Sequence, residues 1–499
     1  MPNTTLIIGA GIGGLTTAAL LAKAGHDVTV LEAHVYGGGC AGTFYHQGYR
    51  FDAGATLAGG FNSGGPHDQV AQRLGIEWPI VAAEPAWRTH LPDRVFTRYG
   101  DPKRWREELG RATVDLPDQA SILRFFESAE KISDAAWAFA GRRPAWPPSG
   151  IGDLTRLAGA LRPDTLVTLP HLFESMGAWA ARSGVVSQPA RAFLDAQLLI
   201  SAQTTAINAN AVFGAAAIDL PRKGVNHVRG GIGGIAQTLV DAIRRDGGKV
   251  LFRQEVTALE TNGGRIVAAR TNKGLRVECQ RCIANLTPWD LARLLGDAAP
   301  APLARETRTR PEQWGAFTLY LGVEDSGLPE DCDHHQVVGD YDLPLGETNS
   351  VFVSLSLQGD PGRAPPGMRA ITISTHTRAA DWWTLRDAPG GKDAYAARVA
   401  AYAERMLDGA ERAIPGLRRK IRLLKPGTPV TFRTFTRRHR GGVGGFAFTS
   451  LLTARGPGVG LSNTWLVGDS IFPGQSTAGV TMGALRVADE VMRSLAGRV

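Results

Sequence analysis

The apolar positions at the start of the chain form two short runs separated by a longer segment with helical spacing. Thr5–Ile8 is an apolar run before glycines, and Asp27–Leu31 is a β-branched run that ends at Glu32. Between them, Ile12–Ala24 repeats apolar residues at the spacing of one helix face. The pattern therefore predicts a strand, a helix and a second strand over Thr4–Glu32.

The rest of the chain mixes strand and helix patterns, which predicts an α/β protein. Residues 37–66 are too rich in glycine for regular structure, and we expect ligand-lining loops there. A β-hairpin is predicted at Trp87–Tyr99, helices dominate residues 117–187, and an amphipathic helix is predicted within Gly230–Arg245. Residues 464–494 return to strand, turn and helix. Further strands are predicted at residues 249–259, 265–271, 275–283, 314–323, 350–357 and 370–375.

Composition limits the class of protein. A hydrophobic share of 43% and a charged share of 20% are those of a folded soluble protein. Four cysteines are too few for a disulfide framework in 499 residues, which favours a reducing cytoplasm. The net charge is +8, but the sequence shows no stripe of basic residues interleaved with aromatic ones, as a nucleic-acid binder would have. We therefore expect no nucleic-acid partner. The same charge would favour an anionic membrane surface.

We expect any membrane contact to be peripheral. The chain runs from Met1 directly into an apolar strand, which leaves no room for a signal peptide. No stretch reaches the roughly 18 to 20 uncharged apolar residues that a transmembrane helix needs. Leu154–Gly177 has two interpretations, a buried helix pair or a peripheral membrane surface, because it is apolar around much of its circumference and broken by prolines. The expected location is therefore cytoplasmic, with helices in about residues 150–185 touching the inner face of the membrane.

The first strand is followed by a glycine motif that predicts dinucleotide binding. Gly9, Gly11 and Gly14 match G-x-G-x-x-G directly after a strand and before a helix, with Gly13 inside the motif. The first glycine allows the tight turn, the second lets the backbone approach a pyrophosphate, and the third permits close helix–strand packing. Glu32 lies about 20 residues further on, where a carboxylate accepts hydrogen bonds from a ribose 2′-OH and disfavours the 2′-phosphate of NADP.

Two further motifs favour FAD over NAD as the dinucleotide. The run Gly37–Thr43 follows Glu32 and would bring bare backbone at Gly39 and the Thr43 hydroxyl beside the cofactor. Near the other end of the chain, a strand ends in Gly468 and Asp469, whose carboxylate can bind a ribityl hydroxyl. Gly479 and Val480 follow at a helix start, where backbone amides can stabilise negative charge on the flavin.

Over nearly its whole length the chain resembles the carotenoid desaturase and carotenoid isomerase family of flavoproteins, which includes bacterial phytoene desaturases. The resemblance rests on GAGIGGLTTAALLAKAGHDVTVLEA, GGGCAGTF, GYRFDAGAT, RGGIGGIAQTLVDAIRRDGG, ANLTP and GDSIFPGQSTAGVTMGALRVADEV. Within the family, the C-3′,4′ desaturases are most similar, from FDAGATLAGGFNSGGPH, LPHLFESMGAWA, FLDAQLLISAQ and GTPVTFRTFTRRHRGGVGG. The resemblance implies a backbone contact of Val256 with the adenine, and hydride transfer from an allylic carbon to flavin N5.

These features together predict a Rossmann-like FAD-binding domain of the two-dinucleotide-binding type, with an inserted α+β substrate domain of mixed sheet and helices. We expect the FAD-binding domain at residues 1–75, 222–300 and 455–499. The substrate domain is expected at residues 76–221 and 301–454.

No acid–base constellation is visible, so catalysis is assigned to the flavin, with Asp52, His67 and Arg229 as weak candidates. Arg437–Arg440 could also lie near the flavin ring. Asp52 is more simply explained as a turn residue, and Arg437–Arg440 as a solvated or lipid-facing charge run. Glycines 230–234 fit a second nucleotide site poorly, since the strand before them is too short and no acidic residue follows a second strand at the proper spacing, and we expect them to pack against FAD. No metal is expected. Cys279 and Cys282 have metal-like spacing but lie in a predicted strand without a second pair.

The predicted function is FAD-dependent desaturation of an acyclic or monocyclic carotenoid, with oxygen or a quinone as the final electron acceptor. A carotenoid cis–trans isomerase that uses reduced FAD has the same cofactor motifs and remains an alternative. A flavoprotein that binds carotenoid without catalysis is a third possibility. An amine oxidase shares the N-terminal motif, but the end of this chain shows no pair of aromatic residues that would enclose an amine.

Overall fold

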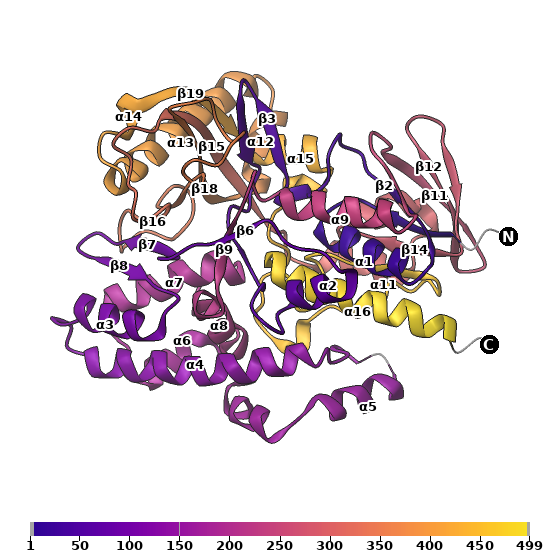
Figure 1. The fold of residues 1–499 in the computed structure, drawn as a ribbon, viewed down its shortest axis with the longest axis horizontal. Helices are drawn as coiled ribbons and strands as arrows, with labels where there is room; N and C mark the ends of the chain where they lie inside the picture. The colour runs from indigo at the N-terminus through magenta and orange to yellow at the C-terminus, as the bar shows by residue number, and fades with distance from the viewer. Residues whose placement is uncertain (1–3, 149, 497–499) are drawn as a thin grey trace.

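A parallel five-stranded sheet forms the first layer of the computed structural model, which describes residues 4–148 and 150–496 (Figure 1). Its order is β10 (Lys249–Leu251), β2 (Asp27–Leu31), β1 (Thr4–Ile8), β14 (Arg281–Ala284) and β20 (Thr464–Leu466). Every residue of β1 and β14 is buried, as expected for a sheet covered on both faces. Strands from three distant parts of the sequence therefore lie side by side.

Three helices cover this sheet. α1 (Ile12–Lys23) contacts both α9 (Gly234–Arg245) and α16 (Ser476–Ala496). Residues 12–22 of α1 are all buried, because the helix lies between these neighbours and the sheet. α9 instead has one apolar face, which buries Ile235, Leu239 and Ile243. The predicted strand–helix–strand unit at the start of the chain is confirmed.

A seven-stranded sheet forms the second layer. Its order is β19 (Ile421–Gly427), β15 (Trp314–Glu324), β18 (Met368–Arg378), β17 (Ser350–Leu355), β16 (His334–Val338), β7 (Trp87–His90) and β8 (Val95–Arg98). All its pairs are antiparallel except β16 with β7. α12 (Ala379–Asp387) and α13 (Gly391–Ala413) pack on one face over a core that includes Phe317 and Trp382. The predicted hairpin at residues 87–99 is confirmed as β7 and β8.

Smaller elements join these sheets. β11 (Val256–Asn262), β12 (Arg265–Thr271) and β13 (Arg276–Glu278) form one three-stranded sheet, and β5 (Ala58–Gly59), β9 (Val225–Val228) and β6 (Ile80–Ala82) form another. Further helices are α2 (Pro66–Leu74), α10 (Pro288–Leu295), α11 (Ala301–Thr309), α14 (Leu417–Lys420), α15 (Pro429–Thr436), η1 (Gly39–Ala41), η3 (Leu220–Lys223), η4 (Gly296–Ala298), η5 (His439–Gly441) and η6 (Leu451–Thr453). The predicted strands at 249–259 and 275–283 are each divided into two.

The glycine-rich residues 37–66 contain more regular structure than predicted. β3 (Thr43–His46) and β4 (Tyr49–Asp52) pair as an antiparallel hairpin. Phe44 and Phe51 from this hairpin pack against Tyr320 of β15, with ring centroids 4.8 and 5.6 Å away. Packing between distant aromatic residues, rather than local propensity, therefore stabilises these strands.

A group of helices within residues 102–218 lies on one side of the two large sheets (Figure 1). They are α3 (Pro102–Ala112), α4 (Gln119–Gly141), α5 (Ile151–Ala160), η2 (Pro163–His171), α6 (Met176–Arg182), α7 (Gln188–Ala202) and α8 (Ala211–Ile218). Trp105, Phe125 and Phe193 are central to their common core. The buried-helix interpretation of Leu154–Gly177 is wrong, since many of its apolar side chains are exposed. None of the helices described here has the length and apolar character needed to cross a membrane.

The strands of each large sheet come from the sequence segments of one predicted domain. All strands of the five-stranded sheet fall within residues 1–75, 222–300 and 455–499, and all strands of the seven-stranded sheet fall outside them. The domain boundaries themselves stay a prediction.

Candidate cofactor and substrate cavity

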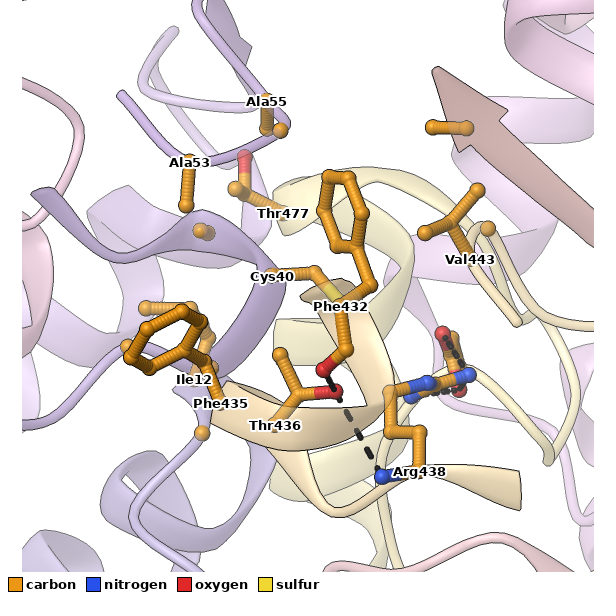
Figure 2. Close-up of a pocket in the computed structure, with 18 of the residues that line it drawn as sticks. Ile12, Cys40, Ala53, Ala55, Phe432, Phe435, Thr436, Arg438, Val443 and Thr477 are labelled. Atoms are coloured by element: carbon orange, nitrogen blue, oxygen red, sulfur yellow. Dashed lines mark hydrogen bonds and ion pairs between the residues drawn. The ribbon is translucent and has the colours of Figure 1, made fainter. Parts of the chain in front are cut away.

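A cavity of about 860 Å³ extends from the five-stranded sheet to the seven-stranded sheet. One end is lined by the turn after β1, the end of β2 and the turn after β20. The other end is lined by side chains of β15, β16, β17 and β18 and by residues of α7. α15 covers the cavity between them, and Figure 2 shows its Phe432 and Phe435 together with Cys40 at the cavity wall.

The glycine motif forms the tightest part of the wall. Gly9 has a φ of +91°, a conformation that favours glycine. A Cβ on Gly11 would lie 2.4 Å from Asn285 Nδ2, and one on Gly14 would lie 2.4 Å from the Gly9 carbonyl oxygen. Gly9, Gly11 and Gly13 line the cavity, whereas Gly14 packs behind it as predicted. Since Gly11 caps α1 without a side-chain hydrogen bond, the first amides of the helix are available to a phosphate.

Glu32 lies at the cavity wall just after β2. Its Oε2 accepts a hydrogen bond from the Ala10 amide at 2.6 Å, and its Oε1 accepts one from the His34 amide at 2.7 Å. Burial raises the pKa of Glu32, although these backbone donors and Arg437 oppose the shift. The two amides fix the carboxylate in place, and each oxygen can accept a further hydrogen bond.

Three further candidates for cofactor binding are Gly39, Thr43 and Val256, and two of them line the cavity. Gly39, with a φ of +59°, and Val256, at the start of β11, are in the wall. Thr43 is not. Its hydroxyl donates to Asp52 Oδ1 at 2.8 Å and accepts from the Gly233 amide at 2.9 Å. The expectation that the Thr43 hydroxyl lies beside a cofactor is therefore corrected, because that hydroxyl connects the β3–β4 hairpin to the turn before α9.

The C-terminal motif meets the glycine motif at Asn285. A Cβ on Gly13 would lie 2.9 Å from the Gly468 amide, and one on Gly468 would lie 2.9 Å from Asn285 Oδ1. Gly468, Asp469 and Val480 line the cavity. Gly479 does not, and a Cβ there would lie 2.1 Å from the Gly474 carbonyl oxygen, so it serves close packing. Thr477, at the start of α16, has a buried hydroxyl without a partner at the cavity wall.

Arg438 corrects the interpretation of the arginine run. Its Nη2 lies 2.9 Å from Asp469 Oδ2, and its Nε donates to the Gly442 carbonyl at 2.7 Å. Burial alone would lower the pKa of Arg438, but the Asp469 carboxylate more than offsets this and raises it. Figure 2 shows the ion pair of Arg438 as dashed lines at the cavity edge. The predicted solvated run is thus wrong at Arg438, because its charge is paired inside the protein.

The neighbouring residues are also in contact with the protein. Arg437 pairs with Glu255 at 3.1 Å, and His439 stacks on Trp289 with centroids 5.2 Å apart. Arg440 alone of this run is exposed, where it pairs with Glu312. The run therefore connects α15 to both sides of the cofactor end of the cavity.

None of the three weak catalytic candidates lines the cavity. Asp52 is buried, pairs with Arg363 at 3.0 Å and accepts from the Ile232 amide at 2.8 Å. His67 is 1% exposed and stacks on Phe61, and burial lowers its pKa to about 3. Arg229 is exposed. Asp52 and His67 thus have structural roles, and Arg229 lies outside the cavity.

Glycines 230–234 also serve packing rather than a ligand. A Cβ on Gly231 would lie 2.5 Å from Thr43 Oγ1 and 2.6 Å from Asp52 Oδ1. None of these glycines lines the cavity, so the expectation that they pack directly against FAD is corrected. In residues 4–148 and 150–496, no group of three or more His, Cys, Asp or Glu side chains could hold a metal ion.

The far end of the cavity offers little for acid–base chemistry. Its wall includes Trp87, Tyr320 and Phe352, and the Tyr320 hydroxyl donates to the Ala53 carbonyl at 2.6 Å. Burial raises the pKa of Tyr320. Burial lowers the pKa of His376 to about 4, so it is neutral at physiological pH. This end is suited to an apolar ligand with a few amide and hydroxyl contacts.

Sequence reasoning did not assign Asn285 to the site, and it preferred a solvated position for Arg438 over one near the flavin ring. Asn285 belongs to the ANLTP motif that contributed to the family resemblance, so a signal for it was present. Arg438 gave no comparable signal, because its partner Asp469 is close only in the folded protein.

Comparisons with known proteins agree with this architecture. A family model described as an NAD(P)-binding Rossmann-like domain matches residues 7–74. A prolycopene isomerase of Arabidopsis thaliana is 27% identical over 97% of this chain and 82% of its own length. A lycopene-forming phytoene desaturase of a Paracoccus species is 25% identical over 99% of this chain and 98% of its own. The solved structure of cyclohexylamine oxidase from Brevibacterium oxydans shares the fold, with a TM-score of 0.62 and 15% identity over 100% and 99% of the two chains.

The Rossmann-like fold and the full-length relatives define an oxidoreductase with a dinucleotide-binding domain. Within that class, the chain is similar over nearly its whole length to carotenoid desaturases and carotenoid isomerases.

Proposed function

We propose that this protein is an FAD-dependent enzyme that acts on the conjugated chain of a carotenoid. The observation that carries the proposal is one continuous cavity, which joins a glycine and carboxylate cradle at one end to an apolar wall at the other. A dinucleotide with a large reactive ring system would occupy the first end, and an apolar polyene would occupy the second. Both ligands would then meet under α15.

The residues present fit FAD. The cradle of Gly9, Gly11 and Gly13 leaves no room for a Cβ, and the start of α1 offers amides for a pyrophosphate. Glu32 would bind the adenosine ribose, and the amides at the start of α16 would face the ring system. Bound FAD would supply a two-electron redox centre. The contribution of the chain is to position both ligands and to exclude water.

The reaction we propose is desaturation, with C-3′,4′ as the bond, as the sequence resemblance implies. Forming one double bond removes two electrons and two protons from the substrate, so a final acceptor is required, and we propose oxygen or a quinone. The aromatic, mostly uncharged far wall supports this assignment, because a polyene delocalises developing charge and needs no strong base from the protein.

Cis–trans isomerisation is the second candidate, and the similarity to prolycopene isomerases favours it. It would use the same cavity and the same cofactor contacts without net oxidation of the substrate.

The two reactions are distinguished by product mass. Purified protein is loaded with FAD and incubated with defined acyclic and monocyclic carotenoids, in air and under anaerobic conditions with reduced flavin. A product two mass units lighter supports desaturation, and an unchanged mass with a shifted geometric isomer supports isomerisation. If FAD and carotenoid bind but no substrate is converted, the protein is a carrier and the proposed activity fails.

A further inference from the structure

A pair of polar side chains lies in the seven-stranded sheet directly behind the cavity wall. His334 of β16 and Ser354 of β17 are partners in the antiparallel pairing of these strands, and the next pair on the same face is Gln336 with Phe352. Gln336 and Phe352 line the cavity, whereas His334 and Ser354 do not. His334 is 1% exposed and Ser354 is 4% exposed, so their pair is buried next to the wall.

Thr56 connects this buried pair to the cavity. It belongs to the loop between β4 and β5, is half-buried and lines the cavity, and Figure 2 shows its neighbour Ala55 among the residues of the wall. The hydroxyl oxygens of Thr56 and Ser354 are 2.7 Å apart, and Ser354 Oγ is 3.0 Å from His334 Nδ1. A hydroxyl can donate one hydrogen bond while it accepts another. The three side chains therefore form one hydrogen-bonded chain from the cavity to a buried imidazole.

The imidazole at the end of this chain is available to accept a proton. Burial lowers the pKa of His334 well below its ordinary value, and His227 adds to this shift, so the ring is neutral at physiological pH. Its Nε2 has no hydrogen-bond partner among the described residues. The rings of His334 and His227 lie with their centroids 4.6 Å apart, and His227 Nε2 is 3.2 Å from Asp333 Oδ2.

The Asp333 carboxylate supplies a negative charge beside the imidazole. Burial would raise the pKa of Asp333, but the hydrogen bond from His227 and the charge of Arg369 outweigh burial and lower it. Asp333 in turn raises the pKa of His334, whereas His335 and Arg369 lower it. The Asp333 side chain is 19% exposed and so reaches solvent. A proton that arrives at His334 is thus received next to an ionised carboxylate.

Desaturation requires that a proton leave the cavity. One hydrogen of the substrate leaves as a hydride, with both electrons of its C–H bond, and oxidised FAD accepts it in the proposed reaction. The neighbouring carbon then loses a proton, and the electron pair of that C–H bond becomes the second bond of the new C=C. Since the cation next to it makes this proton strongly acidic, a neutral hydroxyl backed by an imidazole is a sufficient acceptor.

We propose that Thr56, Ser354 and His334 form a relay that carries this proton out of the cavity, an inference that rests on the proposed desaturation. Thr56 Oγ1 accepts the proton while the proton of the Thr56 hydroxyl moves to Ser354, and that of Ser354 moves to His334 Nδ1. Both hydroxyls are restored, His334 becomes an imidazolium, and the net proton is later lost to water. Thr56 is the member that faces the substrate, whereas Ser354 and His334 act through it.

The experiment follows flavin bleaching in a single anaerobic turnover of FAD-loaded protein with detergent-dissolved carotenoid, and the product mass is measured afterwards. Ser354→Ala and Thr56→Val each remove one hydroxyl of the relay, whereas Ser354→Thr retains it. The matched control Ser356→Ala removes a buried hydroxyl that accepts from the Ala370 amide at 3.3 Å and does not line the cavity. We expect both relay variants to bleach at least about tenfold more slowly than wild type, and Ser354→Thr and the control to resemble wild type.

Mixtures of light and heavy water give a second readout. If several protons move together, the wild-type rate falls along a curve as the deuterium fraction rises, whereas Ser354→Ala gives a straight line. Binding of FAD and carotenoid and thermal unfolding should be unchanged in Ser354→Ala and Thr56→Val, which separates loss of proton transfer from a structural effect. If one of these two variants does not fold, the other decides.

Equal bleaching rates in wild type and the relay variants, or a straight line for wild type, would overturn the relay and leave the desaturation intact. If wild type bleaches no flavin and forms no product two mass units lighter, the proposed desaturation fails. The relay then fails with it, because no proton has to be removed.

Discussion

Replacing Arg438 by glutamine would leave the Asp469 carboxylate at the cavity wall without its counter-charge. The side chains are 18% and 15% exposed, and the guanidinium also loses its hydrogen bond to the Gly442 carbonyl. Breaking a fully buried pair costs about 3–5 kcal/mol, so for this partly solvated pair we expect a loss of about 2–3 kcal/mol in the free energy of unfolding. FAD should also be held more weakly, because Asp469 loses its fixed orientation.

The assay is urea unfolding of Arg438→Gln, Asp469→Asn and the double variant. Because each single change leaves one buried charge without a partner, we expect the double variant to be more stable than the sum of the two losses predicts, by about 1–2 kcal/mol. Arg440→Gln is the matched control, since it breaks an ion pair whose partners are both 45% exposed and should cost less than about 1 kcal/mol. Strictly additive losses, or an equal loss in the control, would refute the reasoning.

Three further predictions concern the cofactor end and the protein interior. Gly14→Ala places a Cβ 2.4 Å from the Gly9 carbonyl oxygen and should lower stability by about 1–3 kcal/mol, measured by thermal unfolding; an unchanged melting temperature would show that the helix can shift without cost. Glu32→Ala should weaken FAD binding by about 1–3 kcal/mol in a fluorescence titration, and full retention of FAD would count against the ribose assignment. Burial lowers the pKa of His67 to about 3 and that of His376 to about 4, so both are neutral when folded but take up a proton on unfolding below about pH 6.5. The free energy of unfolding is therefore not reduced by these histidines above that pH, and it falls as the pH drops toward 4, by about 1.4 kcal/mol per pH unit for each histidine. His67→Gln should reduce the slope of the free energy of unfolding against pH. An identical slope in this variant would contradict the prediction.

Features set by local sequence were predictable, whereas those set by distant contacts were not. The strand–helix–strand unit and the β7–β8 hairpin follow from apolar spacing and turn residues within short segments. The β3–β4 hairpin was missed because its stability comes from Tyr320, far along the chain. The positions of Gly9 and Glu32 in the cavity wall could be predicted from the spacing of the glycine motif and the acidic residue that follows the second strand, since this motif fixes the direction of the amides in the turn.

Side-chain partners were the least predictable part of the site. Thr43 is the expected residue type near a cofactor, but its hydroxyl is used by Asp52 and Gly233. Arg438 belongs to a run of charges that is indistinguishable from a solvent-exposed one until Asp469 is brought beside it. The apolar spacing of Leu166 and Leu169 indicated a face, but not whether protein or another medium covers it.

The order of strands in the five-stranded sheet has a consequence for biosynthesis. β14 pairs with β1 on one side and with β20 on the other, and β20 begins only at Thr464. At about 5–20 residues per second, a ribosome needs roughly 9–36 s to reach β20 after it has completed β14. During this interval the edge of β14 has no partner strand and is open to incorrect pairing. The cofactor cradle can therefore be completed only when translation of the chain is nearly finished, so loading of the proposed FAD would be a late, largely post-translational event.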